Sequence, residues 1–453
     1  MYDTIAAIAT PIGTGGIAVI RVSGKEAFEI CDKIFKSPKN KRLSCAKTHT
    51  AMFGGIYDED VLLDECLCTV FVSPKSFTGE NTVEISCHGG ILVTRRILDC
   101  VIKSGARLAL PGEFTKRAFL NGRLDMAQAE AVIDVINAKS NQAASLALSH
   151  MQGSLSAMIN ELRESILDII AEIDAVSDFP EEDFEKITFD EIKERLFSAS
   201  EKIERLIKTE QRGKLIQSGI DTVIAGKPNV GKSSLLNAIL LSDRAIVTDI
   251  PGTTRDVIEE TVSLGDVTLN IFDTAGIRET DDKIEHIGIE KSKEYLGRAE
   301  LVLFLTDAGT GVTEEDEILL KLLDGKKVIL VINKTDIADK KEISFHGKSF
   351  EAVHISAKTG EGVSELLEKI EKMFHLGEIE KSDFPILTKA AHKQALCRAK
   401  GFIDSAKAAL GVMPDDMISI DLRASVQALG EITGIEVSED VVDRIFSKFC
   451  LGK

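Results

Sequence analysis

The sequence predicts a multidomain protein that combines α/β and all-α folds. Three observations support this prediction. Residues 226–233 read G-x-x-x-x-G-K-[ST], the phosphate-binding loop of nucleotide triphosphatases, between a short apolar strand pattern and a segment with helical spacing. Residues 215–375 alternate strand and helix patterns, which is typical of a parallel sheet with crossover helices. Helical patterns flank this region on both sides, so we expect a P-loop domain inserted into a discontinuous helical domain.

The composition is that of an ordinary soluble protein, with 453 residues, 44% of them hydrophobic and 28% charged. This length suits about three domains. No apolar run reaches the roughly 18 residues of a membrane span, and residues 1–4 lack the basic region of a secretory signal. The net charge of −18 argues against a protein that coats nucleic acid, but it leaves room for a local basic patch that holds one structured RNA.

Residues 1–120 predict a first domain of mixed α+β type. Apolar runs predict strands at 17–22, 66–72 and 82–86. Apolar side chains at helical spacing predict a helix over 91–103. Cys66 and Cys68 alternate within one strand and should share a face. The eight cysteines form no Cys-x-x-Cys pair, which favours buried, reduced thiols in a cytoplasmic protein over a metal pair.

The helical domain is predicted to have two parts, residues 121–214 and 379–453. The expected helices are 126–138, 142–176, 189–208, 388–410, 420–429 and 441–449. The second of them should stop just before Pro180, because proline cannot continue a helix. The nucleotide domain, residues 215–378, lies between the two parts, and such an insertion could couple nucleotide state to helix packing.

The phosphate-binding loop predicts specific roles for its side chains. Its glycines let backbone N–H groups face the phosphates, and the following helix adds its positive N-terminal end. Lys232 is expected to reach the β- and γ-phosphates, and the Ser233 hydroxyl is expected to bind Mg²⁺. Thr254, between this loop and Asp273, stands where a switch threonine would also bind Mg²⁺.

Further motifs in the expected order predict a GTP-hydrolysing domain. Residues 273–276, D-T-A-G, follow a strand, where a carboxylate can hold the Mg²⁺ shell and the Gly276 N–H can meet the γ-phosphate. In the N-K-T-D motif, Asp336 can accept hydrogen bonds from guanine N1–H and N2–H, a donor pair that adenine lacks. The S-A-K motif at 356–358 completes the base pocket.

The predicted GTP-binding residues come from these five motifs. They are Asn229, Val230, Gly231, Lys232, Ser233, Ser234, Thr248, Asp249, Ile250, Pro251, Gly252, Thr253, Thr254, Asp273, Thr274, Ala275, Gly276, Asn333, Lys334, Asp336, Ser356, Ala357 and Lys358.

The residue after the D-T-A-G motif is informative. Many small GTPases place a glutamine there to orient the attacking water, whereas this chain has Ile277, which cannot. Another group or a bound ion must then act, and Asn229 with the oxygen-rich residues 248–253 could hold a monovalent cation. The alternative is an intrinsically slow enzyme, and the residues leave both interpretations open.

Beyond these motifs, the chain resembles the tRNA-modifying GTPase MnmE (TrmE) family over its full length. The resemblance is carried by the phosphate loop, T-D-I-P-G-T-T-R-D at 248–256, S-F-T-G-E at 76–80, P-G-E-F-T-K-R-A-F-L-N at 111–121 and the terminal C-L-G-K. Leu451 stands where the family usually has isoleucine. The resemblance implies a Ras-like G domain and an N-terminal domain similar to folate-binding domains of the glycine-cleavage T-protein type.

The resemblance also implies an activity and its partners. The family forms homodimers and, with the FAD protein MnmG, heterotetramers in the cytoplasm. Together they add a (carboxymethyl)aminomethyl group to C5 of the wobble uridine of certain tRNAs. GTP, Mg²⁺ and K⁺ are the implied cofactors, and the carbon comes from 5,10-methylenetetrahydrofolate, for which 5-formyltetrahydrofolate is an analogue.

Site residues carry over from the family position by position. The folate contacts fall on Arg21, Glu84, Arg123 and Lys453, although the family often has lysine where this chain has Arg123. The K⁺ ligands fall on Asn229, Thr248, the backbone of Ile250, and Thr253. The catalytic glutamate that helps to place the water falls on Glu285, which fills the gap left by Ile277.

Cys450 is a second catalytic candidate, near the cationic chain end Lys453. A nearby ammonium favours the thiolate, and modification at C5 of a uridine commonly needs a nucleophile or proton carrier. The alternative is a buried cysteine that caps a helix. A rival function, a non-enzymatic switch such as a ribosome-assembly GTPase, needs neither the terminal cysteine nor a folate-type domain.

Overall fold

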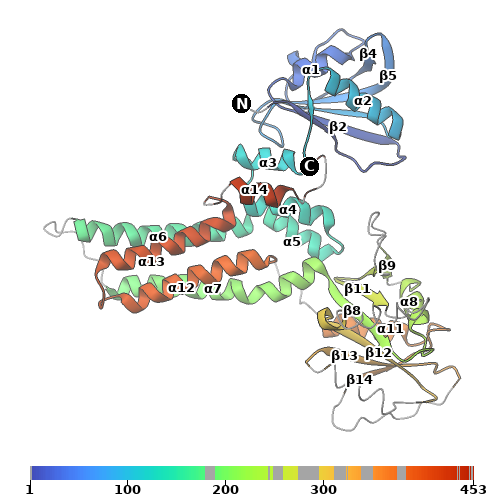
Figure 1. The fold of residues 1–453 in the computed structure, drawn as a ribbon, viewed down its shortest axis with the longest axis vertical. Helices are drawn as coiled ribbons and strands as arrows, with labels where there is room; N and C mark the ends of the chain where they lie inside the picture. Colours follow the sequence, from blue (N-terminus) through green and yellow to red (C-terminus); the bar gives the residue numbers. More distant parts are fainter. Residues whose placement is uncertain are drawn as a thin grey trace, which may run out of the picture. The chain divides into compact units, whose positions relative to one another are not determined.

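The computed structural model (Figure 1) describes most of the chain in two compact units. The described residues are 3–178, 189–242, 245–247, 259–273, 295–310, 323, 325–337, 350–374, 384–435, 437, 439–447, 449 and 452. The first unit holds Met1–Ile133, His150–Glu201 and Ala395–Lys453. The second unit holds Asp134–Ser149 and Lys202–Gln394.

The first unit contains a seven-stranded mixed sheet in the order β3-β4-β5-β6-β2-β1-β7. Its strands are β1 (Ile5–Ile8), β2 (Ile17–Ser23), β3 (Phe35–Lys36), β4 (Thr50–Asp58), β5 (Val61–Phe71), β6 (Thr82–His88) and β7 (Arg107–Leu108). The strands expected at 17–22, 66–72 and 82–86 correspond to β2, β5 and β6. The short strand β1 pairs antiparallel with β2 and parallel with β7, which the sequence did not predict.

Two helices cover one face of this sheet, α1 (Ala27–Ile34) and α2 (Ile91–Lys103). The helix predicted over 91–103 is confirmed as α2. Cys66 and Cys68 both point into the core between sheet and helices, with their Sγ atoms 3.9 Å apart, which confirms that they share a face. The hydrogen bond to Cys66 and burial raise the pKa of the Cys68 thiol. Cys68 is therefore a neutral thiol in the core.

Further helical elements of the chain are α3 (Glu113–Leu120), α4 (Met126–Asn137), α5 (Asn141–Met151), α6 (Ser154–Asp178), α7 (Phe189–Ser218), α12 (Ala390–Ala409), α13 (Asp415–Thr433) and α14 (Glu439–Phe446). Among the predicted helices, α7 and α13 are longer than predicted, whereas α4, α12 and α14 are slightly shorter. The prediction of a single helix over 142–176 was wrong. This segment forms two helices, α5 and α6, because Gly153 adopts a left-handed φ of 92° that interrupts the helix.

Within the first unit, α6 and α13 pack against each other along their length (Figure 1). Their apolar faces are buried, for example at Ile166 and Leu422. Polar contacts line the edge of this packing, where Asp174 pairs with Arg423 at 2.5 Å and accepts a hydrogen bond from Ser419 at 2.9 Å. α6 runs to Asp178, the last described residue before Pro180.

The second unit contains a seven-stranded sheet in the order β14-β13-β12-β8-β11-β10-β9. Its strands are β8 (Ile220–Gly226), β9 (Ala245–Val247), β10 (Glu259–Leu264), β11 (Val267–Asp273), β12 (Leu301–Asp307), β13 (Lys327–Asn333) and β14 (Glu351–His354). The five strands from β14 to β11 run parallel, and β10 pairs antiparallel with both β11 and β9. The mainly parallel sheet predicted for the nucleotide domain is confirmed.

The helices α8 (Lys232–Leu240) and α11 (Val363–Met373) bury apolar faces against this sheet. The strands β12 and β13 are almost continuously buried, as expected for central parallel strands. The predicted fold class, a multidomain α/β and all-α protein, is thus confirmed. Among the described helices, none combines the length and hydrophobicity needed to cross a membrane.

Candidate functional site

The carboxyl ends of the parallel strands in the second unit bring the predicted nucleotide motifs together. The phosphate loop follows β8 and leads into α8, whose first residue is Lys232. Gly226 has φ 147°, and a side chain there would collide with the carbonyl oxygen of Leu305 on the neighbouring strand. The Nζ atom of Lys232 donates to the carbonyl oxygens of Gly226 at 3.0 Å and Lys227 at 2.8 Å. The lysine therefore lies against the loop that it is expected to serve.

Asn333, at the end of β13, joins three of the predicted motifs. Its side chain is 2% exposed. Its Nδ2 donates to the carbonyl oxygen of Val230 in the phosphate loop at 2.8 Å. Its Oδ1 accepts hydrogen bonds from the backbone N–H groups of Lys334 at 2.8 Å and Ala357 at 2.9 Å. A Cβ on Gly231 would collide with this Nδ2, so glycine is required there.

The base-recognition residues are held by their own contacts. Asp336 accepts a hydrogen bond from the Ser356 hydroxyl at 2.8 Å, which fixes the orientation of its carboxylate. Lys334 pairs with Asp307 at 2.8 Å, and this hydrogen bond lowers the pKa of Asp307. Sequence reasoning missed Asp307. An acidic residue at the end of an apolar strand, at the same sheet edge as the other motifs, was the signal available.

Asp273 is the last residue of β11, and it pairs with Ile224 on the neighbouring strand β8. Its backbone thus lies at the same sheet edge as the phosphate loop. Ser233, Ser234 and Lys358 are described and exposed. Several predicted residues lie outside the described part of the chain, namely Thr248, Asp249, Ile250, Pro251, Gly252, Thr253, Thr254, Thr274, Ala275, Gly276, Ile277, Glu285, Cys450 and Lys453.

A second candidate site lies on the N-terminal sheet. Arg21 on β2 faces Glu84 on β6, and its Nε donates to Glu84 Oε1 at 2.9 Å. The Arg21 guanidinium carbon lies 5.4 Å from the ring centre of Phe77 and 5.6 Å from that of Phe114. The two aromatic residues come from the two N-terminal signatures, so these signatures converge on Arg21. This convergence was not predicted.

The other predicted folate residues relate to this site in different ways. The side chain of Arg123 packs near Gly79, whose added Cβ would lie 3.2 Å from Arg123 Cγ. Gly452, next to the predicted Lys453, is buried against the main chain of Ile8 at the end of β1. The structure therefore brings the C-terminal end of the chain to the N-terminal sheet within the first unit.

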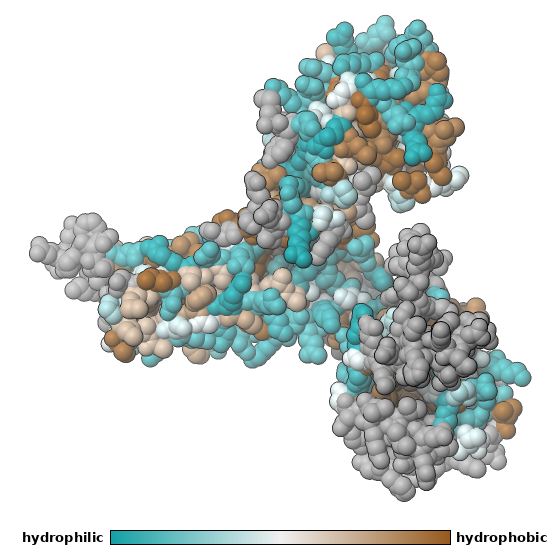
Figure 2. Space-filling model, in the orientation of Figure 1, coloured by the Kyte–Doolittle hydropathy of each residue, from teal (hydrophilic) through white to brown (hydrophobic). Residues whose placement is uncertain are grey.

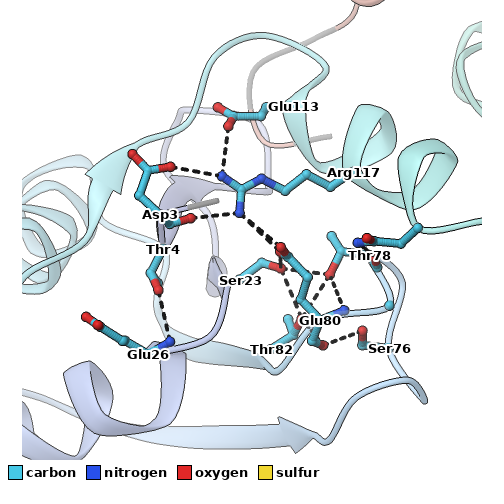
Figure 3. A network of polar contacts seen from close by, with 12 residues as sticks. Asp3, Thr4, Ser23, Glu26, Ser76, Thr78, Glu80, Thr82, Glu113 and Arg117 are labelled. Atoms are coloured by element: carbon cyan, nitrogen blue, oxygen red, sulfur yellow. Dashed lines mark hydrogen bonds and ion pairs between the residues drawn. The ribbon is translucent and has the colours of Figure 1, made fainter. Parts of the chain in front are cut away.

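A buried arginine links the two signatures (Figure 3). Arg117 on α3 has a side chain that is 2% exposed, and it pairs with Glu80 at 3.2 Å and with Glu113 at 3.0 Å. It also donates to the Asp3 carbonyl oxygen at 2.8 Å. On the other side of Glu80, Ser23 donates to Oε2 at 2.8 Å. The network thus ties the loop that carries Phe77 to the helix that carries Phe114.

Arg107 extends the network at its exposed end. It pairs with Asp3 at 2.6 Å and with Glu113 at 2.7 Å. The hydrogen bond from Arg107 lowers the pKa of Asp3 to about 2. Burial alone would raise the pKa of Glu113, but hydrogen bonds from Arg107, the Leu110 N–H and Arg117 outweigh it, and that pKa is lowered. The carboxylates of Asp3 and Glu113 are therefore charged near neutral pH.

Comparison with known proteins gives two matches to family models. The description "GTP-binding protein TrmE N-terminus" matches residues 4–123, and "MnmE helical domain" matches residues 126–450. Proteins described as "tRNA modification GTPase MnmE" are similar over all of this chain. The protein from Acetivibrio thermocellus is 47% identical over 99% of its length. Those from Geobacillus kaustophilus and Bacillus subtilis are 46% and 44% identical over 99% and 100% of theirs.

Solved structures of Era and of the FeoB G domain are similar to part of the chain. Era from Aquifex aeolicus, bound to GDP and AlF₄⁻, is 29% identical and covers 40% of this chain and 65% of its own, with a TM-score of 0.29. The G domain of the Thermotoga maritima FeoB iron transporter is 32% identical and covers 33% of this chain and 96% of its own, with a TM-score of 0.25.

Proposed function

Since the chain belongs to the MnmE family of tRNA modification GTPases, we propose that it hydrolyses GTP at the phosphate-loop site during modification of tRNA wobble uridine. The observation that supports nucleotide binding most directly is Asn333, which joins the phosphate loop to both base motifs. Asp336, oriented by Ser356, would select guanine. Ser233 and Thr254 would bind the Mg²⁺ that accompanies the phosphates.

We further propose that K⁺ supports hydrolysis in place of a water-orienting glutamine. Asn229, in the phosphate loop at φ 63°, would contribute a ligand together with Thr248, Ile250 and Thr253. Glu285 would place the attacking water. Under this proposal, a bound ion and Glu285 take the role that Ile277 cannot fill.

GTP turnover is expected to be slower in NaCl than in KCl at equal ionic strength, by about tenfold or more, because a preorganised positive charge near the phosphates is lost. In KCl, Glu285→Ala is expected to slow single-turnover hydrolysis while GTP affinity stays nearly constant. Equal rates in the two salts would reject the cation site, and an unchanged single-turnover rate would reject the role of Glu285.

For the modification itself, we propose that the N-terminal site binds 5,10-methylenetetrahydrofolate and that MnmG is the partner. The residues present suit a folate. Arg21 and Glu84 offer a charged donor and acceptor with 16% and 26% exposed side chains, beside the rings of Phe77 and Phe114. A carboxylate can pair with pterin N–H groups, arginine with folate carboxylates, and aromatic rings with a flat heterocycle. Arg123 and Lys453 complete the proposed set.

The position of the chain end supports a role for Cys450. Gly452, two residues after Cys450 in the sequence, lies against Ile8 on β1, the strand next to the one that carries Arg21. Cys450 would act there as a nucleophile or proton carrier towards C5 of the uridine. This proposal competes with a purely structural cysteine.

Cys450→Ser is expected to abolish wobble-uridine modification in cells that lack the wild-type protein, while GTP turnover and the thermal melt of the purified variant stay unchanged. Mass spectrometry of tRNA nucleosides measures the modification. Cells that lack the whole protein provide the reference, and retained modification in those cells would favour a non-enzymatic switch. Normal modification with the serine variant would assign the chemistry to the partner protein.

We propose that the chain acts in the cytoplasm as a homodimer and as a heterotetramer with MnmG. One face of the N-terminal sheet is not covered by α1 and α2, and it exposes Ile17, Phe53 and Leu67. Hydrophobic residues also gather over this domain in Figure 2. Such a face suits pairing of two N-terminal domains. Sedimentation of the full chain, alone and with MnmG, would test both assemblies, and a monomer in both samples would contradict them.

A further inference from the structure

The segment from residue 33 to residue 57 is unusual for this acidic chain. It contains six lysine and arginine residues and no aspartate or glutamate, whereas the whole chain has 73 acidic and 55 basic residues. All six basic side chains belong to exposed residues of the N-terminal domain. Because the rest of the chain is strongly negative, an exposed cluster of this kind is selective for a negatively charged partner.

The two basic residues at the start of the segment already have partners. Lys33 donates to the carbonyl oxygen of Ser104 at 2.9 Å. Lys36 lies 3.7 Å from Asp60 and 4.5 Å from the ring centre of Tyr57. The remaining four, Lys39, Lys41, Arg42 and Lys47, make no ion pair with any described residue. We call these four residues the basic loop.

The carboxylates closest in sequence to the basic loop have other hydrogen-bond or ion-pair partners. Asp32 accepts hydrogen bonds from the N–H groups of Leu43 at 2.6 Å and Ser44 at 3.2 Å, and from the Ser44 hydroxyl at 2.6 Å. Its charge thus holds the shape of the loop. Asp58, the last residue of β4, pairs with Lys103 on α2 at 3.0 Å.

The segment that carries the basic loop has a defined conformation. Leu43 is fully buried and anchors the short 3₁₀ turn of residues 43–45, while Asn40 takes a left-handed φ of 49°. A loop held at Leu43 and by Asp32 presents its cations without a large ordering cost on binding. The segment that carries these cations therefore has a fixed shape.

We propose that the basic loop binds the sugar-phosphate backbone of tRNA. The proposal rests on tRNA being the substrate, as argued under the proposed function. Phosphates spaced along a polyanion match several cations on one loop, and such contacts position an RNA without reading its sequence. An anionic membrane is the other phosphate-bearing surface, but the only large apolar side chain within residues 37–49, Leu43, is buried and offers no membrane anchor.

The test replaces Lys39, Lys41, Arg42 and Lys47 together by glutamine in the full chain. The matched control replaces four exposed lysines elsewhere, Lys193, Lys208, Lys214 and Lys372, also by glutamine. Binding of an unmodified tRNA transcript is measured between about 50 and 200 mM KCl, a range over which phosphate contacts weaken strongly. GTP turnover without RNA and a thermal melt of each variant establish that the fold and the nucleotide site are intact.

The basic-loop variant is expected to bind tRNA at least about tenfold more weakly, with a slope of log K against log salt reduced by about 3, since each of the four phosphate contacts contributes about 0.7–0.9. The loss should be similar for different tRNAs. The control should bind like the wild type. An unchanged affinity and slope, an equal loss in the control, or a wild type that binds anionic phosphatidylserine vesicles but not tRNA would each overturn the proposal.

The outcome is separate from that of the Cys450→Ser experiment. If the basic-loop variant keeps its tRNA affinity while Cys450→Ser loses modification, the surface is wrong and the proposed function stands. If tRNA binding depends on the basic loop but cells lacking the protein keep their wobble modification, the surface stands and the proposed chemistry is wrong.

Discussion

Replacing Arg117 by methionine is expected to destabilise the N-terminal domain locally by about 3–5 kcal/mol, because removing one partner of a buried ion pair leaves an uncompensated charge. Glu80, with a 16% exposed side chain, would lose its only cationic partner among the described residues. Glu113 would keep Arg107. The loop with Phe77 and the helix with Phe114 would then be less firmly joined beside Arg21.

Hydrogen exchange of the full chain measures this effect locally, in peptides that cover Asp3, residues 76–80 and α3. Arg95→Met on the exposed side of α2 is the matched control and should change protection by no more than about 0.5 kcal/mol. Adding Glu80→Gln to Arg117→Met should recover part of the loss. Equal protection in Arg117→Met and wild type would show that the network contributes nothing to local stability.

The same network predicts that the local stability of the N-terminal domain depends on pH. The pKa of Asp3, at about 2, and that of Glu113 are lowered in the folded protein. Carboxyl groups with lowered pKa stabilise the fold above their unfolded pKa of about 4, and this contribution is lost as the pH falls towards 2. The difference in protection between wild type and Arg117→Met is therefore expected to shrink below about pH 4.

Asn333→Ala is expected to raise the Kd for GTP about a hundredfold, equivalent to about 3 kcal/mol. The substitution removes the hydrogen bonds to Val230, Lys334 and Ala357 and leaves buried backbone groups without partners. Both the phosphate loop and the base pocket lose a common support. This is a larger effect than removal of a single contact to the nucleotide.

Titration with a fluorescent GTP analogue measures the Kd directly. Asn237→Ala, an exposed asparagine on α8, is the matched control and should bind like the wild type. A thermal melt of Asn333→Ala separates lost affinity from lost folding. If the variant melts normally and binds GTP with wild-type affinity, Asn333 has no supporting role.

Much of the nucleotide domain could be predicted because each motif combines local spacing with a position at a strand end. The phosphate loop, the N-K-T-D motif and the S-A-K motif all lie where the alternating pattern placed them. Asp307 could not be predicted in this way. It meets Lys334 only because β12 and β13 pair in a register that places Asp307 opposite Asn333, and register is a long-range property.

The N-terminal domain was harder to predict for the same physical reason. Glu80 and Arg117 were noticed only as parts of two signatures, and nothing local in either sequence shows that they form one ion pair. The break at Gly153 was missed for a different reason. Apolar spacing continues across it, and a single glycine is tolerated in many helices, so periodicity alone joined α5 and α6.

The packing of α6 on α13 has a consequence for synthesis of the protein. α6 ends at Asp178 and α13 begins at Asp415, so the whole nucleotide domain is translated between them. At roughly 5–20 residues per second, this interval lasts on the order of tens of seconds. During that time the face of α6 that carries Ile166 has been made but the helix that finally covers it has not. Until the ribosome reaches the last helices, this face of α6 therefore has no α13 to pack against.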